Sequence, residues 1–94
     1  MKRTKSYANV WDAIEPDPVV RENLKLRSVL MSELTRHIQR QGLTQAEAAK
    51  LFGVSQPRVS NLVRGKIDSF SLDLLANMAA AAGLHVTMKV RQAA

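Results

Sequence analysis

Polar side chains gather in one short segment, residues 55–62, around two apolar ones. Val59 and Leu62 are three residues apart and would share the inner face of a helix, which leaves Gln56, Arg58 and Asn61 to face outward. Amide groups can donate and accept hydrogen bonds, whereas a guanidinium only donates. In the major groove of DNA, Gln or Asn can bind adenine through two hydrogen bonds, and Arg can bind guanine in the same way. The segment therefore predicts a helix that reads bases.

A second group of polar and basic residues lies near the expected helix starts and in the loop that follows. Hydroxyl, amide and cationic groups at such places bind phosphate oxygens, which sets register and affinity rather than sequence preference. The candidate phosphate ligands are Thr44, Gln45, Ser55, Ser60, Arg64 and Lys66. The alternative interpretation is an ordinary helical hairpin with a solvated polar face.

Two short helices joined by a glycine turn are expected to position these side chains. Thr44, with Glu47 three residues later, forms a capping box that begins the first helix. Gly53 permits the positive φ that turns the chain, and Ser55 caps the second helix. Together they predict a helix-turn-helix with its core at residues 44–65.

A long helix is predicted over roughly residues 18–41, because apolar residues recur there at three- and four-residue spacing. Asp17 is a suitable N-cap, and Gly42 can end the helix in the left-handed conformation. Arg27 is the polar position within the apolar stripe, so we expect it at the edge of the stripe.

A further helix is predicted over about residues 72–82, with Ser71 as its N-cap. The expected fold is therefore mainly all-α, a bundle of four to five helices. The DNA-binding domain would span residues 18–83.

The C-terminal segment, residues 84–94, begins with an alternation of apolar and polar side chains over residues 84–90, which is a strand pattern. A single strand cannot satisfy its own backbone hydrogen bonds. We expect it to pair antiparallel with the same strand of a second copy across a two-fold axis, with Val86, Met88 and Val90 at the dimer contact. The alternative is a frayed terminus.

Residues 1–17 are expected to form a flexible N-terminal arm. Tyr7, Val10, Trp11 and Ile14 would form an apolar patch that binds a protein partner, and the acidic residues beside them suit a basic one. The alternative is that Trp11 packs on the long helix.

Composition restricts the possible functions. Lys and Arg number 14 against 8 Asp and Glu, a net charge of +6, which favours a polyanionic partner. The sequence has no cysteine, and its two histidines are too few and too isolated for a zinc site. No phosphate loop, metal-ligand spacing or nucleophile arrangement occurs, so we expect no enzyme, no cofactor and no small-molecule ligand. No apolar run approaches the ~20 residues that span a bilayer, and we expect a cytoplasmic protein.

The stretch "GLTQAEAAKLFGVSQPRVSNLVRGK", followed by "FSLDLLANMAAAAGLHVTMKV", resembles the lambda-repressor-like (Xre) DNA-binding fold. More narrowly, it resembles the HigA-type antitoxins of bacterial toxin–antitoxin operons. The opening "NVWDAI", the start "ENLKLRS" of the long helix and the C-terminal strand pattern fit that subgroup as well. Phage-type repressors without a toxin partner share the core motif.

The resemblance implies roles for particular residues. Bases would be read by the first residues of the second short helix, Gln56, Pro57 and Arg58, and by Asn61 one turn later. Pro57 departs from the commoner glutamine or serine and would offer only an apolar contact. Gln45 would bind a phosphate. Similar proteins bind palindromic operators as homodimers, repress their own operon and sequester a HigB-like ribonuclease toxin.

Overall fold

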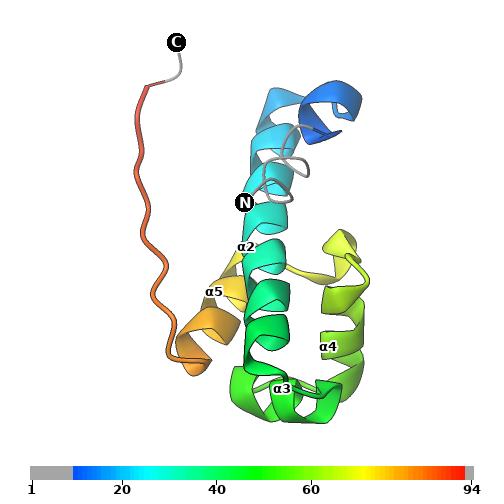
Figure 1. Cartoon of the computed structure of the whole chain (residues 1–94). Helices are drawn as coiled ribbons and strands as arrows, with labels where there is room; N and C mark the ends of the chain where they lie inside the picture. The colour runs from blue at the N-terminus through cyan, green and yellow to red at the C-terminus, as the bar shows by residue number, and fades with distance from the viewer. Residues whose placement is uncertain (1–9, 93–94) are drawn as a thin grey trace.

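The protein is described here by a computed structural model that covers residues 10–92. A long helix, α2, forms the axis of the molecule, and three shorter helices gather around its C-terminal half (Figure 1). Residues 10–14 are also helical and precede α2. The elements in chain order are α2 (Pro18–Gln41), α3 (Gln45–Phe52), α4 (Gln56–Val63), the 3-10 turn η1 (Ile67–Ser69) and α5 (Leu72–Ala81). The prediction of a mainly helical fold is confirmed.

Local capping sets where α2 begins and ends. The Asp17 carboxylate accepts hydrogen bonds from the backbone N–H groups of Val19, at 2.9 Å, and Val20, at 3.4 Å. Gly42 adopts a φ of 63° and ends the helix in the left-handed region, which costs glycine nothing because it has no Cβ. Both predicted ends of the long helix are confirmed.

The three shorter helices begin at the predicted caps. The backbone N–H of Thr44 donates to Glu47 Oε1 at 2.8 Å, and Thr44 Oγ1 accepts from the Glu47 N–H at 3.1 Å, which completes the capping box. Ser55 Oγ accepts from the Arg58 N–H at 3.2 Å, and Ser71 Oγ accepts from the Leu74 N–H at 3.1 Å. These side chains satisfy N–H groups that have no partner within the helix.

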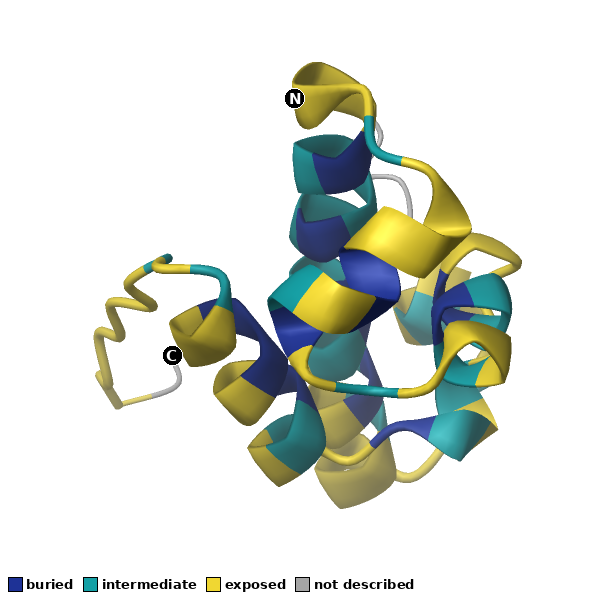
Figure 2. Cartoon of the chain, turned by 90° about the horizontal axis from the view of Figure 1, so that it is seen from below, coloured by how far each residue is buried: buried dark blue, intermediate teal, exposed yellow. Residues whose placement is uncertain are grey.

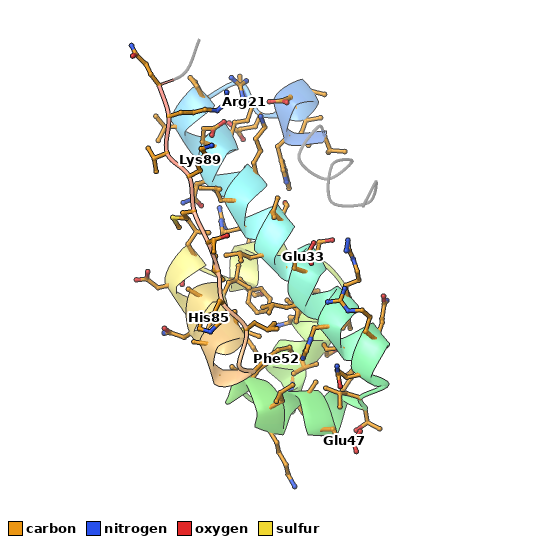
Figure 3. The ribbon with its side chains drawn as sticks, turned by 60° about the vertical axis from the view of Figure 1, so that its left-hand side comes forward. Arg21, Glu33, Glu47, Phe52, His85 and Lys89 are labelled. Atoms are coloured by element: carbon orange, nitrogen blue, oxygen red, sulfur yellow. The ribbon has the colours of Figure 1, made fainter. Side chains whose placement is uncertain are left out.

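The core lies where α2 packs against α4 and α5, and where α3 packs against both of those shorter helices. Burial follows this arrangement in Figure 2, and Figure 3 shows Phe52 inside the molecule while Glu47 lies at its surface. The core is mostly aliphatic. Its members are Met31, Leu34, Ile38, Ala48, Ala49, Phe52, Val59, Leu62, Phe70, Leu75, Met78 and Ala79.

The chain after α5 departs from the prediction. Leu84 is anchored through its N–H, which donates to the Ala79 carbonyl at 2.9 Å, but residues 85–92 are extended and exposed. They stand apart from the helices and run back roughly parallel to α2 (Figure 1), and no strand forms anywhere within residues 10–92. The predicted C-terminal strand is therefore absent from the single chain, because a strand needs a neighbouring strand for its N–H and C=O groups.

Candidate nucleic-acid interface

Buried side chains on the inner face of α4 fix the position of the helix and so of its outer face. Val59 is 0% exposed and Leu62 is 1% exposed, so these two side chains anchor the helix on the core. Gln56 and Pro57, at the first turn of α4, are exposed, and Asn61 is half-buried. Because α4 packs against both α3 and α2, its first turn is presented on a rigid support. This geometry suits a helix that enters a groove of DNA with its N-terminal residues.

Arg58 lies differently from its neighbours on α4. Its Nη1 donates to the carbonyl of Ser69 at 2.6 Å, and its Cζ lies 5.7 Å from the centroid of the Phe70 ring. The side chain is half-buried and follows the turn after η1 rather than extending outward. Arg58 is the charged residue among the four predicted to read bases, and its guanidinium makes contacts within the protein.

Asn61 also has an internal contact, although a more exposed one. Its Oδ1 accepts a hydrogen bond from Arg64 Nη2 at 3.1 Å, three residues later on the same surface. This contact positions the Arg64 guanidinium beside the end of α4. It also orients the Asn61 amide, whose NH2 group can still donate.

The candidate phosphate ligands lie mostly at the surface. Thr44, Gln45 and Ser55 are exposed at the starts of α3 and α4, and Arg64 and Lys66 are exposed after α4. Ser60 is half-buried. The Thr44 and Ser55 hydroxyl oxygens accept from backbone N–H groups as N-caps, and each hydroxyl retains a proton to donate to a phosphate.

The charged residues of the helix-turn-helix are mostly positive. Between Leu43 and Lys66 the sequence has four cationic residues and one carboxylate, and that carboxylate, Glu47, closes the capping box with the Thr44 N–H. The cations are Lys50, Arg58, Arg64 and Lys66. Phosphate attraction scales with such an excess, so the region can bind a polyanion electrostatically.

Arg27 is a residue that the site analysis of the sequence missed. From α2, its Nη1 donates to the carbonyls of Ile67, at 3.1 Å, and Phe70, at 3.2 Å, while its Nε donates to Asn23 Oδ1 at 2.6 Å. The available signal was its place as a polar residue in an apolar stripe. Such a position requires a polar partner on another element.

The predicted partner patch is only partly described. Tyr7 lies outside the described residues. Trp11 rests on α2, where its Nε1 donates to the buried Ser28 Oγ, and Asp12 pairs with Lys25 Nζ at 2.6 Å. Val10 and Ile14 are exposed. The docking of Trp11 matches the alternative interpretation, and the exposed pair keeps an apolar surface available beside it.

A groove of about 450 Å³ lies between α2 and α4. Its lining combines apolar side chains with polar ones, including Trp11, Met31, Thr35, Arg36 and Leu62.

Among the described residues, no helix is long and apolar enough to cross a membrane. The same residues hold no group of three or more acidic or histidine side chains that could bind a metal ion.

The helix-turn-helix geometry agrees with a comparison with known families. A family model described as a helix-turn-helix domain matches residues 15–91, which includes α2 through α5 and most of the extended C-terminal segment. No curated protein matches the chain.

Proposed function

Because the chain belongs to the helix-turn-helix domain family, we propose that it is a sequence-specific, DNA-binding transcriptional regulator that acts in the cytoplasm. The observation that carries the proposal is the first turn of α4. Gln56 and Pro57 are exposed there, on the same short helix as Val59 and Leu62, which are buried in the core. A rigid helix with an amide at its exposed N-terminal turn is suited to base edges in the major groove.

Phosphate contacts would provide most of the affinity. Gln45 at the start of α3 and Lys66 after α4 are exposed on either side of the reading helix in the sequence, and both can bind the DNA backbone. Gln45→Ala and Lys66→Ala should therefore weaken binding to all sequences by a similar factor. Gln56→Ala should instead relax the preference at one base pair.

The proposal includes a homodimer that binds a palindromic operator. Val86, Met88 and Val90 are 44%, 79% and 91% exposed and alternate along an unpaired, extended segment. Pairing with the same segment of a second copy would satisfy its backbone groups and cover these side chains. Two copies of α4 would then enter successive major grooves about 34 Å apart. Sedimentation of a chain that lacks residues 84–94 should give a monomer, and a persisting dimer would exclude this pairing.

We further propose that the regulator is a HigA-type antitoxin, which represses its own operon and neutralises a HigB-like ribonuclease toxin. The sequence resemblance supports this role. The exposed Val10 and Ile14 support it too, because they lie beside three carboxylates, Asp12, Glu15 and Asp17, that would attract a basic ribonuclease. The proposed antitoxin does not itself catalyse a reaction.

A second candidate function is a stand-alone or phage-type Xre repressor without a toxin. The docking of Trp11 on α2 favours it, because the largest side chain of the arm is then already used within the molecule. Copurification with the product of the neighbouring gene distinguishes the two candidates. A stable complex that is lost in Ile14→Asp, but kept in a control such as Lys50→Gln, would favour the antitoxin.

The first experiment is a salt-resolved titration of the purified protein against the DNA upstream of its own gene and against a scrambled duplex. Sequence-specific binding predicts a preference of ~10³-fold or more for the upstream DNA. Equal affinities with the same steep salt dependence would leave phosphate attraction alone and would contradict the proposed regulator.

A further inference from the structure

Two arginines from different helices donate to one turn. Arg58 of α4 donates to the Ser69 carbonyl at 2.6 Å, and Arg27 of α2 donates to the Ile67 and Phe70 carbonyls at 3.1 and 3.2 Å. The turn is η1 with the residue that follows it, residues 67–70. We call this arrangement the arginine clamp: Arg27, Arg58 and the carbonyls of the turn.

The clamp adds charged donors to the carbonyls of the turn, one of which, that of Ile67, also accepts from the Phe70 N–H at 3.1 Å. Carbonyls at the end of a short 3-10 turn carry a partial negative charge that attracts a cation. A guanidinium offers five donors in a rigid plane and holds such carbonyls better than a flexible ammonium would. The Phe70 ring, buried in the core, lies under the Arg58 guanidinium at 5.7 Å and adds a cation–π contact.

The clamp connects the reading helix to the remainder of the fold. Arg58 is the third residue of α4, in the turn next to Gln56 and Pro57, so its contact ties that end of α4 to residues 67–70. Arg27 ties the same residues to α2. Both arginines are therefore linked to the first turn of α4 through residues 67–70, although Arg27 lies on a different helix.

We propose that Arg58 is a positioning residue for DNA recognition and does not read a base: it holds the first turn of α4 in place through the Ser69 carbonyl and the Phe70 ring. This inference rests on the proposed function and replaces the base contact that the sequence pattern suggested for Arg58. Turning outward to guanine would strip the Ser69 carbonyl of a charged donor and break the ring contact. Gln56 and Pro57, which are exposed, then carry the direct contacts at the start of α4.

The test compares base preferences, not only affinities. A preferred duplex is first selected with the wild-type protein from a random pool of about 30 base pairs, enough for two half-sites one helical turn apart. Binding is then measured for every single base-pair change in one half-site. The variants are Arg58→Met and Arg27→Met, which retain a long side chain without the guanidinium, and Gln56→Ala is the base-reading control.

A positioning role predicts the same pattern for both methionine variants. Each should weaken the preferred duplex by about tenfold, the scale of one lost charge-assisted hydrogen bond, while the ranking of all base changes stays as in the wild type. Gln56→Ala should flatten the preference at one base pair only. A flattened preference at one base pair in Arg58→Met, with Arg27→Met unaffected, would overturn the inference, and so would unchanged binding in Arg58→Met.

A second measurement needs no variant and covers the case in which the methionine variants do not fold. The guanidinium signals of Arg58 in the wild-type protein are followed by NMR as the selected duplex is added. Slow proton exchange and unchanged shifts in the complex would support the clamp, whereas a large shift with contacts to guanine would overturn it. If the wild type selects no preferred duplex, the proposed function fails, and that result is distinct from either outcome for Arg58.

Discussion

The two halves of α2 belong to one continuous helix but lie in different surroundings. In the C-terminal half, Met31, Leu34 and Ile38 are buried against the three shorter helices. In the N-terminal half, Leu24 is buried outside that cluster, while Val19 and Leu26 are exposed. Both halves have apolar residues at helical spacing, so the pattern predicts a helix in each. What differs is the cover: α3, α4 and α5 lie alongside the C-terminal half of α2 (Figure 1).

The apolar residues of the two halves of α2 therefore have different roles. The covered half stabilises the domain and holds α4 in place. The N-terminal half is covered in part, by Trp11 at Ser28, and lies near the exposed Val10 and Ile14 and the three carboxylates of residues 10–17. The partner contact proposed above would use Val10 and Ile14, which lie outside the core. The following predictions test that division.

The largest effect is expected from the same substitution in each half. Leu34→Ala should destabilise the protein by about 2–5 kcal/mol, because Leu34 is 1% exposed and the change leaves a cavity in the core. Leu26→Ala should cost less than about 0.5 kcal/mol, since Leu26 is 49% exposed and alanine suits a helix at least as well. Urea unfolding at equilibrium measures both. Equal losses would mean that the N-terminal half is also part of the core.

A smaller effect is expected where residues 10–14 contact α2. Trp11→Phe should cost about 1–3 kcal/mol, because the buried Ser28 hydroxyl loses its donor. Adding Ser28→Ala should recover part of that loss by removing the unpaired group. A double-mutant cycle of urea unfolding free energies gives the coupling between the two residues. A coupling near zero would show that Trp11 does not use Ser28 in solution.

Cap substitutions should distinguish a short helix of the core from the exposed start of α2. Ser71→Ala should cost about 1 kcal/mol, because α5 carries core residues from its first turns and cannot fray without exposing them. Asp17→Ala should cost about 0.5 kcal/mol, the lower end for caps, because the first turn of α2 can fray in solvent. Thermal unfolding measures both, and a larger loss for Asp17→Ala would reverse the proposed order.

The smallest effect is expected from the ion pair between Asp12 and Lys25. Asp12→Asn should cost at most about 1 kcal/mol, since half of the Asp12 side chain is in solvent and salt screens such a pair. The loss should shrink as ionic strength rises. Glu33→Gln, which removes the pair with Arg36 in the other half of α2, is the matched control. A salt-independent loss at Asp12 would point to a role beyond charge.

The sequence predicts much of the fold because capping acts over a few residues. Asp17, the box of Thr44 with Glu47, Ser55 and Ser71 lie within three residues of the N–H groups that they accept from. The helix-turn-helix, its boundaries and its buried pair Val59 and Leu62 follow from this local chemistry and from spacing. The candidate phosphate ligands follow as well, as a prediction that DNA binding would test.

Other features depend on residues far apart in the chain. The sequence placed Arg58 on the outer face of α4, but its contact with Ser69 arises only when η1 folds back against that helix. Likewise, the contact of Arg27 with the carbonyls of Ile67 and Phe70 joins positions some 40 residues apart, and no short-range pattern contains both partners.

The sequence by itself thus determined which segments are helical, where they begin and end, and which side of each helix is apolar. It did so because backbone capping and side-chain periodicity are local. Only the tertiary structure decided which apolar sides are covered, which arginines bind backbone carbonyls, and that residues 85–92 pair with no strand within residues 10–92. Those outcomes depend on which elements pack together, and a guanidinium or an extended backbone finds its partner only after that packing is complete.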